Sequence, residues 1–340
     1  MIVDLTGLLE CKMKTKRDTP SIEARLKHLA DESQPLSVAK LYALSNLERD
    51  DLARVRAAWP NLPDERRRAA MRHLTDITET NFEVDFSPMF RLGLKDSDSA
   101  VREAAIDGLW EVEDPALIAP LVKIMQDDAS EAVRAVAAGT LGHFVYLDEL
   151  EDISHAQVVP ALEALRKIIA TPDDSLEVRR RAVEAIAYSS ADDVPDIIRA
   201  AYASPDELMR VSAVFAMGSS ADDQWIETVI AELEAQSPAM RYEAARAAGE
   251  LEARNAVSTL ARLLDDPDRE VQEVTVWALG QIGGNQAHKL LTQLAKSDDE
   301  ALAEAATEAL EEMEWMHGST RDMPLFVFDP HADEADEDDE

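Results

Sequence analysis

The chain has 340 residues, with 34 Lys and Arg against 69 Asp and Glu, so its formal net charge is −35. Apolar residues make up 46% of the chain, which is enough for a large core and excludes general disorder. A surface this acidic does not hold a phosphate backbone through counterion release, so we predict no nucleic-acid partner.

The sequence also indicates no association with a membrane. No run of about 18 apolar residues occurs, so we predict no transmembrane helix and no membrane partner. The start of the chain carries Asp4 and Glu10 and has no basic region, unlike a secretory signal peptide. Cys11, the only cysteine, cannot form an internal disulfide, which fits a reducing compartment. We therefore expect a cytoplasmic protein, and we expect it to be a monomer.

Residues 1–60 do not show the regular repeat spacing of the later part of the chain, and we predict that they form an N-terminal helical cap. Helices are expected over residues 21–30, 37–47 and 47–59. A further helix over 64–77 reads as a degenerate repeat, because Asp64 stands four residues before Arg68. Terminal repeats are usually atypical, since they cover an exposed end of a stack.

Residues 61–317 carry an internal repeat. With Arg102 as position zero, the same context returns after steps of 32, 45, 31, 31, 31 and 31 residues. The residues at position zero are Arg102, Arg134, Arg179, Arg210, Arg241, Gln272 and Ala303. We interpret these arginines as structural, each contacting a cap Asp four residues upstream or an Asp in the neighbouring repeat. The alternative is that they bind a phosphate or carboxylate.

The columns around position zero describe one helix per repeat. Position −4 always holds a residue whose side chain can cap a helix: Asp98, Ser130, Ser175, Asp206, Ser237, Asp268 and Asp299. Positions −1, +3 and +7 are apolar or small and share one helical face. Glycine recurs at position +8, as Gly142, Gly218, Gly249 and Gly280. Because Gly costs a helix about 1 kcal/mol against Ala, this column indicates a close backbone approach or a shared helix end.

A further helix precedes each of these capped helices. The expected ranges are 115–126, 156–170, 194–203, 223–235, 253–264 and 285–296. No stretch shows useful strand alternation, so we predict an all-α fold, an α-α superhelix of about seven to eight helical-hairpin repeats. The 45-residue step contains an insertion at about 143–158, which we expect to form an edge loop.

Residues 318–340 read as a flexible acidic tail. Residues 333–340 contain seven acids in eight positions, a composition typical of solvated, disordered chain. The apolar stretch 323–328 precedes them, and it could dock on a partner or cover the last repeat.

The run DPDREVQEVTVWALGQIG, residues 266–283, resembles the second helix of a HEAT repeat of the phycobilisome-lyase-like type. Residues 98–109 and 206–218 resemble it too, and the likeness extends roughly over 90–315. The resemblance implies a solenoid whose second helices line the concave face. Members of this broad class include bilin lyases, deoxyhypusine hydroxylase and plain scaffolds.

Motifs for catalysis are missing from the sequence. It has no Gly-rich phosphate loop, no Gly-x-Ser-x-Gly elbow and no Cys-x-x-Cys pair. The resemblance to the hydroxylase implies paired His-Glu motifs for a di-iron centre, but none of the seven histidines is followed by Glu, so we reject that activity. We predict no catalytic residue, no metal site and no cofactor, and a lyase-like activity is the enzymatic alternative.

Positions +1 and +5 of the repeat point most nearly away from its apolar face. Three successive repeats carry an aromatic residue there: Phe215, Tyr242 and Trp277. Aromatic and Arg clusters are enriched at binding hot spots, so we predict a concave surface with an apolar floor and an acidic rim. Its residues are Val211, Phe215, Tyr242, Arg246, Glu273 and Trp277. The alternative is that each helix is rotated by one residue and the aromatics belong to the core.

These patterns favour a non-catalytic protein–protein interaction scaffold or adaptor. The acidic rim suits a basic or amphipathic protein segment, because a field of one sign steers oppositely charged partners. A bilin lyase-like chromophore-handling protein and an acidic nucleic-acid mimic are the alternatives. A salt-adapted host could also produce such an acidic surface without any partner.

Overall fold

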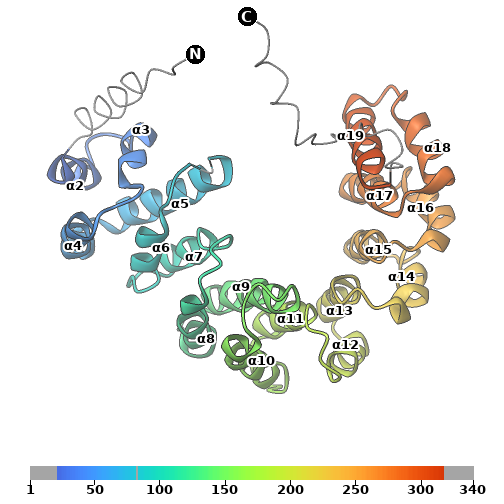
Figure 1. Cartoon of the computed structure of the whole chain (residues 1–340), viewed down its shortest axis with the longest axis horizontal. Coiled ribbons are helices and arrows are strands. Elements are labelled where there is room, and N and C mark those ends of the chain that lie inside the picture. The colour runs from blue at the N-terminus through green and yellow to red at the C-terminus, as the bar shows by residue number, and fades with distance from the viewer. Residues whose placement is uncertain (1–20, 82, 318–340) are drawn as a thin grey trace, which may run out of the picture. The chain divides into compact units, whose positions relative to one another are not determined.

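A computed structural model describes residues 21–81 and 83–317 of the chain (Figure 1). These residues form eighteen α-helices, and no strand occurs among them. The predicted all-α fold built from helical hairpins is therefore confirmed. The acidic tail predicted at 318–340 and the first 20 residues lie outside the described residues.

The chain divides into two compact units, Met1–Ala221 and Asp222–Glu340. The helices of the first unit are α2 (Ile22–Ala30), α3 (Val38–Leu41), α4 (Arg49–Ala58), α5 (Asp64–Thr80), α6 (Ser87–Gly93), α7 (Ser99–Asp107), α8 (Ile118–Asp127), α9 (Glu131–Glu149), α10 (His155–Ile169), α11 (Leu176–Ile186), α12 (Val194–Tyr202) and α13 (Glu207–Ser219). Those of the second unit are α14 (Ile226–Glu232), α15 (Pro238–Glu250), α16 (Val257–Leu263), α17 (Arg269–Ile282), α18 (Gly284–Leu294) and α19 (Glu300–His317).

The predicted caps begin the second helix of each hairpin. Six of the seven stand at N-cap positions, namely Asp98, Ser130, Ser175, Asp206, Ser237 and Asp268. The carboxylate of Asp98, for example, accepts the N–H groups of Ala100 and Val101 at 3.0 and 3.3 Å. The seventh, Asp299, accepts the N–H of Leu302 at 3.1 Å. Backbone donors of these helix starts are thus satisfied by the residues that the sequence pattern singled out, except at Ser237, whose side chain makes no cap hydrogen bond.

Within each unit, the second helices of successive hairpins pack on one another. In the first unit α5 packs on α7, α7 on α9, α9 on α11 and α11 on α13, with α8 and α10 adjacent in the other layer. In the second unit α15 packs on α17 and α17 on α19, while α14, α16 and α18 each pack on the helix that follows (Figure 1). The apolar positions fill these interfaces, as with Val101, Ala105 and Leu109, which are fully buried.

The glycine column marks close approaches between second helices. A Cβ added to Gly142 would lie 3.0 Å from the Cα of Ala185, and one added to Gly249 would lie 2.9 Å from the Cα of Ala278. At Gly280 the nearest atom would be the Cβ of Ala309, at 3.1 Å. Of the two explanations that the sequence left open, the structure therefore supports close approach at these three positions.

The insertion in the 45-residue step lengthens a helix, contrary to our expectation of an edge loop over 143–158. The helix α9 spans 19 residues, against 13 in α13, and runs on to Glu149. Its added turns are helical because Phe144, Val145 and Leu147 pack into the core. Only a short connection separates α9 from α10, which begins at His155.

The N-terminal helices are fixed to the repeats by one buried arginine. The guanidinium of Arg66, at the start of α5, donates to the backbone carbonyls of His28, Leu29 and Gln34 at 2.6, 2.8 and 2.9 Å. These three carbonyls lie at the end of α2 and just beyond it. A single side chain therefore satisfies the C-terminus of α2 and attaches it to α5.

The close approach at Gly249 gives a testable prediction. We expect Gly249→Ala to destabilise the protein by about 1–3 kcal/mol, because its Cβ meets the backbone of α17, which cannot rotate away. Gly139→Ala is the matched control, since Gly139 also lies within a helix and its Cβ would meet nothing within 4 Å. Replacing Gly139 should raise stability by about 1 kcal/mol. Urea unfolding of the three proteins measures both changes, and a stable Gly249→Ala variant would contradict the close approach.

Candidate functional site

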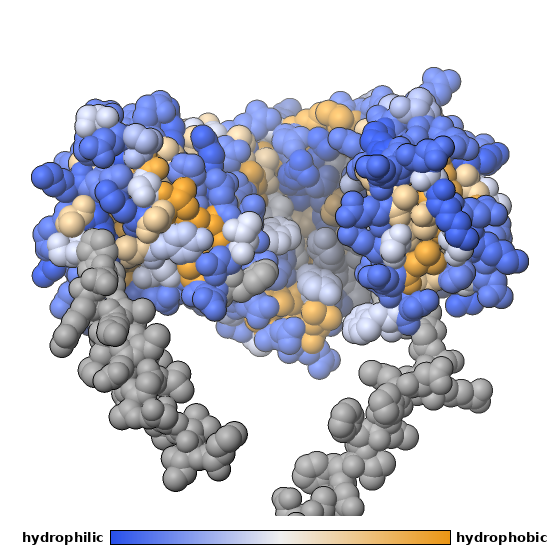
Figure 2. Space-filling model, turned by 90° about the horizontal axis from the view of Figure 1, so that it is seen from above, coloured by the Kyte–Doolittle hydropathy of each residue, from blue (hydrophilic) through white to orange (hydrophobic). Residues whose placement is uncertain are grey.

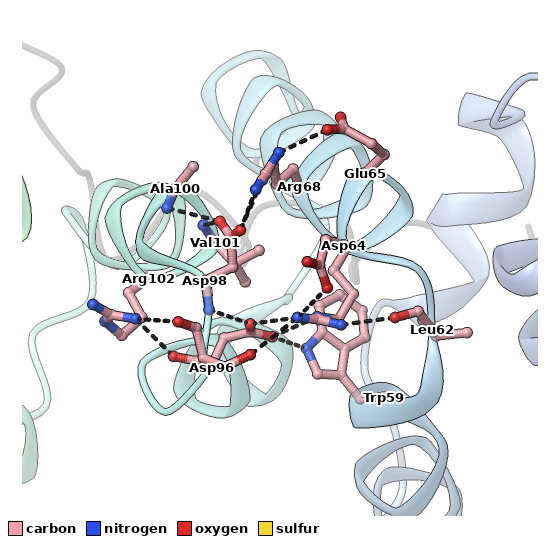
Figure 3. A network of polar contacts seen from close by, with 12 residues as sticks. Trp59, Leu62, Asp64, Glu65, Arg68, Asp96, Asp98, Ala100, Val101 and Arg102 are labelled. Carbon is pink, nitrogen blue, oxygen red and sulfur yellow. Dashed lines mark hydrogen bonds and ion pairs between the residues drawn. The ribbon is translucent and has the colours of Figure 1, made fainter.

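A buried arginine, Arg67, joins α5 to the loop before α7. Figure 3 shows its partners Asp96 and Leu62 and the neighbouring Trp59 gathered between the two helices. The Nε and Nη2 groups of Arg67 donate to the two carboxylate oxygens of Asp96 at 2.9 and 3.0 Å, and Nη1 donates to the carbonyl of Leu62 at 2.7 Å. The indole N–H of Trp59 donates to the same carboxylate at 2.6 Å. The side chains of Arg67 and Asp96 are 4% and 2% exposed, so this pair is buried and fully hydrogen-bonded.

The same contact recurs along the chain, and we call the set the arginine ladder: Arg67–Asp96, Arg102–Asp128 and Arg241–Asp266. The guanidinium of Arg241 donates to both oxygens of Asp266 at 2.7 Å, and that of Arg102 binds Asp128 at 2.8 and 2.7 Å. In each case the aspartate stands two residues before the cap of the next second helix. It also accepts that cap residue's N–H, as Asp266 does from Asp268 at 2.9 Å.

The arginine column is therefore structural at Arg102 and Arg241, whose partner is the aspartate two residues before the next cap. Arg134 donates to Asp174 at 3.3 Å and Arg210 donates to the carbonyls of Ser204 and Pro205, whereas the Nε of Arg179 is buried without a hydrogen-bond partner. One detail of the sequence interpretation is wrong: position zero of the degenerate repeat is Arg67 and not Arg68, because Pro63 occupies the N-cap of α5. Arg68 instead donates to the carboxylate of Asp98 at 2.8 Å. The donors of Arg67, Arg102 and Arg241 are engaged within the protein, which leaves these three arginines poorly suited to hold a phosphate.

Four of the six predicted binding residues lie on α15 and α17, and we call this region the α15–α17 surface (Tyr242, Arg246, Glu273 and Trp277). Trp277 is 36% exposed, and its ring packs over the backbone of the preceding second helix, since a Cβ on Gly249 would meet Cζ3 at 2.7 Å. Tyr242 is half-buried and Glu273 is exposed. Trp277 is thus partly packed against α15 and partly exposed.

Carboxylates dominate the charges of the α15–α17 surface. The Nε of Arg246 donates to Glu243 at 2.7 Å, and its Nη1 forms an ion pair with Glu250. The Nε of Arg269 likewise donates to Glu273 at 3.0 Å. On the neighbouring helix α19, the equivalent outward positions carry Glu304 and Glu308, both exposed. The two arginines are therefore neutralised and the surface remains acidic.

The other two predicted residues, Val211 and Phe215, lie on α13 in the first unit. Val211 is 7% exposed and offers little surface to a partner, whereas Phe215 is half-buried. The burial of Val211 follows from the tight packing of α11 on α13, where the hydroxyl of Ser212 donates to Glu184 at 2.5 Å and accepts from Arg180 at 2.9 Å.

The first unit contains a cleft of about 1250 Å³ that was not predicted from the sequence. We call it the α4–α8 cleft, because the end of α4, the end of α6 and the helix α8 line it. Its apolar lining includes Leu92, Leu94, Leu117, Pro120 and Ile124. Its floor reaches the arginine ladder, since Arg67, Asp96 and Asp128 also line it. The residues that line the cleft are far apart in the sequence, so no local sequence pattern predicts it.

The described residues contain no group of three or more His, Cys, Asp or Glu that could hold a metal ion. Two histidines are partly or fully enclosed. Nε2 of His28 accepts the N–H of Ser37 at 3.0 Å, and burial lowers the pKa of His28, with Lys40 adding to the effect. Burial also lowers the pKa of His143, which packs between Trp110 and Phe144. The carboxylates of Glu113 and Glu111 act on the pKa of His143 in the opposite direction, with a smaller effect than burial.

Over the part of the chain that the structure describes, no helix is both long and apolar enough to cross a membrane. Most of the face drawn in Figure 2 is hydrophilic, with hydrophobic residues gathered in a few places.

Comparison with known proteins supports the repeat interpretation. The family of HEAT repeats matches residues 60–143, 87–175 and 226–311, which together make up more than half of the chain. The protein is therefore a member of the HEAT-repeat family. No curated protein matches the chain in sequence.

Solved structures with similar folds come from several kinds of protein. YibA of Escherichia coli is 18% identical over 83% of this chain and 99% of its own, with a TM-score of 0.44. The complex of CpcE and CpcF of phycocyanin lyase from Nostoc sp. is 17% identical over 67% and 94%, also with a TM-score of 0.44. Human deoxyhypusine hydroxylase is 19% identical over 89% and 98%, with a TM-score of 0.35. At such identities these likenesses concern the fold alone.

The arginine ladder predicts a large loss of stability on removing one partner. Asp266→Ala leaves the nearly buried guanidinium of Arg241 without its counter-charge, so we expect unfolding to become easier by about 3 kcal/mol. Glu234→Ala, which removes the exposed pair with Arg262, should cost less than about 1 kcal/mol. Denaturant unfolding of both variants measures the difference, and equal losses would contradict the special role of the ladder.

The same pair predicts a pH dependence. The hydrogen bonds from Arg241 hold the pKa of Asp266 below its usual range. Such a group contributes stability that is present above its unfolded pKa of about 4 and is lost as the pH falls through its lower folded pKa. The difference in stability between the wild type and Asp266→Ala should therefore be constant from pH 7 to about 5 and shrink below about pH 4. If the difference in stability grew on acidification, the pKa of Asp266 would be raised and not lowered by folding.

Proposed function

We propose that this HEAT-repeat protein is a non-catalytic interaction scaffold whose α15–α17 surface binds a basic or amphipathic segment of a partner protein. The observation that carries the proposal is the position of Trp277, which is 36% exposed and packed on Gly249 amid exposed carboxylates. We further propose that the scaffold acts as a cytoplasmic monomer, with the cap, repeat and tail limits at 1–60, 61–317 and 318–340.

An indole held in this way has the properties of a binding anchor. Its packing against α15 fixes the ring before any partner arrives, so little conformational entropy is lost on binding. Large aromatic rings contribute much of the energy at protein interfaces when a partner covers their exposed part. A partly exposed Trp277 therefore offers a rigid apolar contact of the kind that an amphipathic helix can cover.

The carboxylates decide which partners this anchor accepts. Glu273 and Glu304 are exposed at position +1 of two neighbouring second helices, and Glu308 is exposed at position +5 of the latter. Lys and Arg side chains on a partner would find acceptors there, and the attraction would raise the association rate at low salt. An acidic partner would be repelled by the same charges, so the surface selects by charge as well as by shape.

Two other functions predict different behaviour. A nucleic-acid mimic needs an even spread of acids, and the exposed indole of Trp277 interrupts such a spread. A chromophore-handling protein of the lyase type would bind a coloured tetrapyrrole, so visible absorbance of the purified protein incubated with bilin tests it directly.

The scaffold function can be tested with three proteins of equal charge: the wild type, Trp277→Ala and Trp110→Ala. Trp110 is the matched control because it is 53% exposed but lies in the first unit. We expect Trp277→Ala to lose a partner captured from host lysate by about tenfold or more, a change of about 1.4 kcal/mol, while Trp110→Ala keeps it. The captured protein should contain a basic or amphipathic segment, and its purified form should reproduce the ranking in calorimetry.

The stability of Trp277→Ala is the control for this experiment. Because Trp277 is only partly buried, its loss should cost about 2 kcal/mol, less than the ~3–5 kcal/mol of a fully buried aromatic. Raising the salt should weaken the capture, since exposed charges are screened. Equal capture by the wild type and a folded Trp277→Ala would falsify the proposed anchor.

A further inference from the structure

The helix α8 has one face in the core of the first unit and another in the α4–α8 cleft. Its core face holds buried apolar residues such as Leu121 and Met125. The residues that line the cleft recur at helical spacing on the other face: Ala119, Pro120, Lys123, Ile124 and Asp127. Ala119 and Pro120 are exposed and Ile124 is half-buried, so apolar surface of α8 is accessible inside the cleft.

The cleft has a charge opposite to that of the chain as a whole. Five basic and three acidic side chains line it, in a chain whose net charge is −35. Arg56, Lys95 and Lys123 are exposed, and no ion pair to any of them occurs among residues 21–81 and 83–317. These three cations are therefore available to an anionic partner.

The acids of the lining do not neutralise these cations. Asp96 and Asp128 bind Arg67 and Arg102 of the arginine ladder. Of the lining acids only Asp127 is exposed and outside the ladder. The rim of the cleft keeps a net positive charge, and a cleft concentrates the field of the charges that line it, so the site attracts carboxylates.

The size of the cleft favours a peptide segment over a small molecule. Its volume of about 1250 Å³ exceeds the ~300–1,000 Å³ of ordinary small-molecule pockets. Its apolar residues come from two walls, with Leu92 and Leu94 at the end of α6 and Pro120 and Ile124 on α8. An occupant that matches both features has apolar side chains for these walls and carboxylates for the rim.

We propose that the α4–α8 cleft is a docking site for an acidic amphipathic segment of a partner protein. The apolar side chains of this segment lie against Leu92, Pro120 and Ile124. Its carboxylates pair with Lys95 and Lys123 at the rim. The complementarity is twofold, apolar to apolar and acidic to basic, so neither part alone gives the full affinity.

This docking site goes beyond the proposed scaffold function and does not rest on it. The α15–α17 surface is acidic and selects basic segments, whereas the cleft selects acidic ones. The two sites share no residue, so a failure of either proposal leaves the other untouched. With both sites, one chain distinguishes two classes of partner by charge.

Selection from a random phage-displayed peptide library, with the full-length protein as target, tests the docking site without a known partner. We expect the selected peptides to include a group that combines Asp or Glu with Leu, Ile or Phe. A labelled synthetic copy of such a peptide should bind Lys95→Glu/Lys123→Glu about tenfold or more weakly than the wild type in fluorescence anisotropy, because the reversed charges repel its carboxylates. Carbodiimide, which joins amines to adjacent carboxylates, should cross-link the peptide to Lys95 and Lys123 of the wild type.

Two further variants separate the contributions of charge and position. Lys95→Arg/Lys123→Arg keeps the charge, so it should bind the peptide as the wild type does but lose the cross-links, which need an amine. Lys289→Glu/Lys296→Glu is the matched control, since it makes the same charge reversal at two exposed lysines of the second unit and should leave binding unchanged. All four lysines are exposed, so every variant should keep the circular dichroism of the wild type.

An altered peptide tests the apolar part of the contact. Replacing its apolar residues with Ser keeps its charge and should weaken binding by about tenfold or more, because the apolar walls of the cleft then gain no contact.

Any of three results overturns the proposal. The first is a selection that yields no group of acidic and apolar peptides. The second is equal binding of such peptides to the wild type and to Lys95→Glu/Lys123→Glu, which would place them elsewhere on the protein. The third is equal binding of the original and the Ser-substituted peptide, which would mean a diffuse attraction between charges and no docking in the cleft.

Discussion

The buried contact between an arginine and the aspartate of the next loop joins successive repeats of this protein at three places. In the pair of Arg241 and Asp266, one carboxylate binds the guanidinium of one repeat and the cap N–H of the next. Burying either charge alone would be costly, and the bidentate geometry together with the backbone hydrogen bonds offsets that cost. Because the aspartate precedes the cap, the same residue sets where a second helix begins and where it sits against its neighbour.

This contact also explains how one acidic chain presents two surfaces of opposite character. Asp96 and Asp128 are paired with arginines of the ladder, so their carboxylates do not neutralise the exposed cations of the α4–α8 cleft beside them. On the α15–α17 surface the situation is reversed, because Arg246 and Arg269 are paired within the surface and the remaining glutamates set its charge. Local pairing, and not the net charge of −35, decides what each surface can attract.

Local signals made much of the fold predictable from the sequence. The caps, the apolar face and the glycine column lie within a few residues of one another, and Asp98, Ser130 and Gly249 behave as those patterns indicated. The insertion was misread because the sequence shows a changed spacing but not that Phe144 and Leu147 would find a core to enter.

Long-range pairings were harder to predict. The partner of Arg102 lies 26 residues away, and the α4–α8 cleft gathers side chains from three elements, so neither follows from periodicity. The exposure of Trp277 follows from its position in the repeat, whereas the burial of Val211 depends on how tightly α11 packs on α13.

The close contacts at Gly249 and Gly280 have a further consequence for the history of such a chain. Each glycine meets an alanine in the next second helix, Ala278 or Ala309, at a matching step of 31 residues. The glycine–alanine contact between α15 and α17 therefore recurs between α17 and α19. Duplication or loss of one 31-residue unit would keep this contact at the new junction, so the length of the array can change without loss of the close approach between second helices.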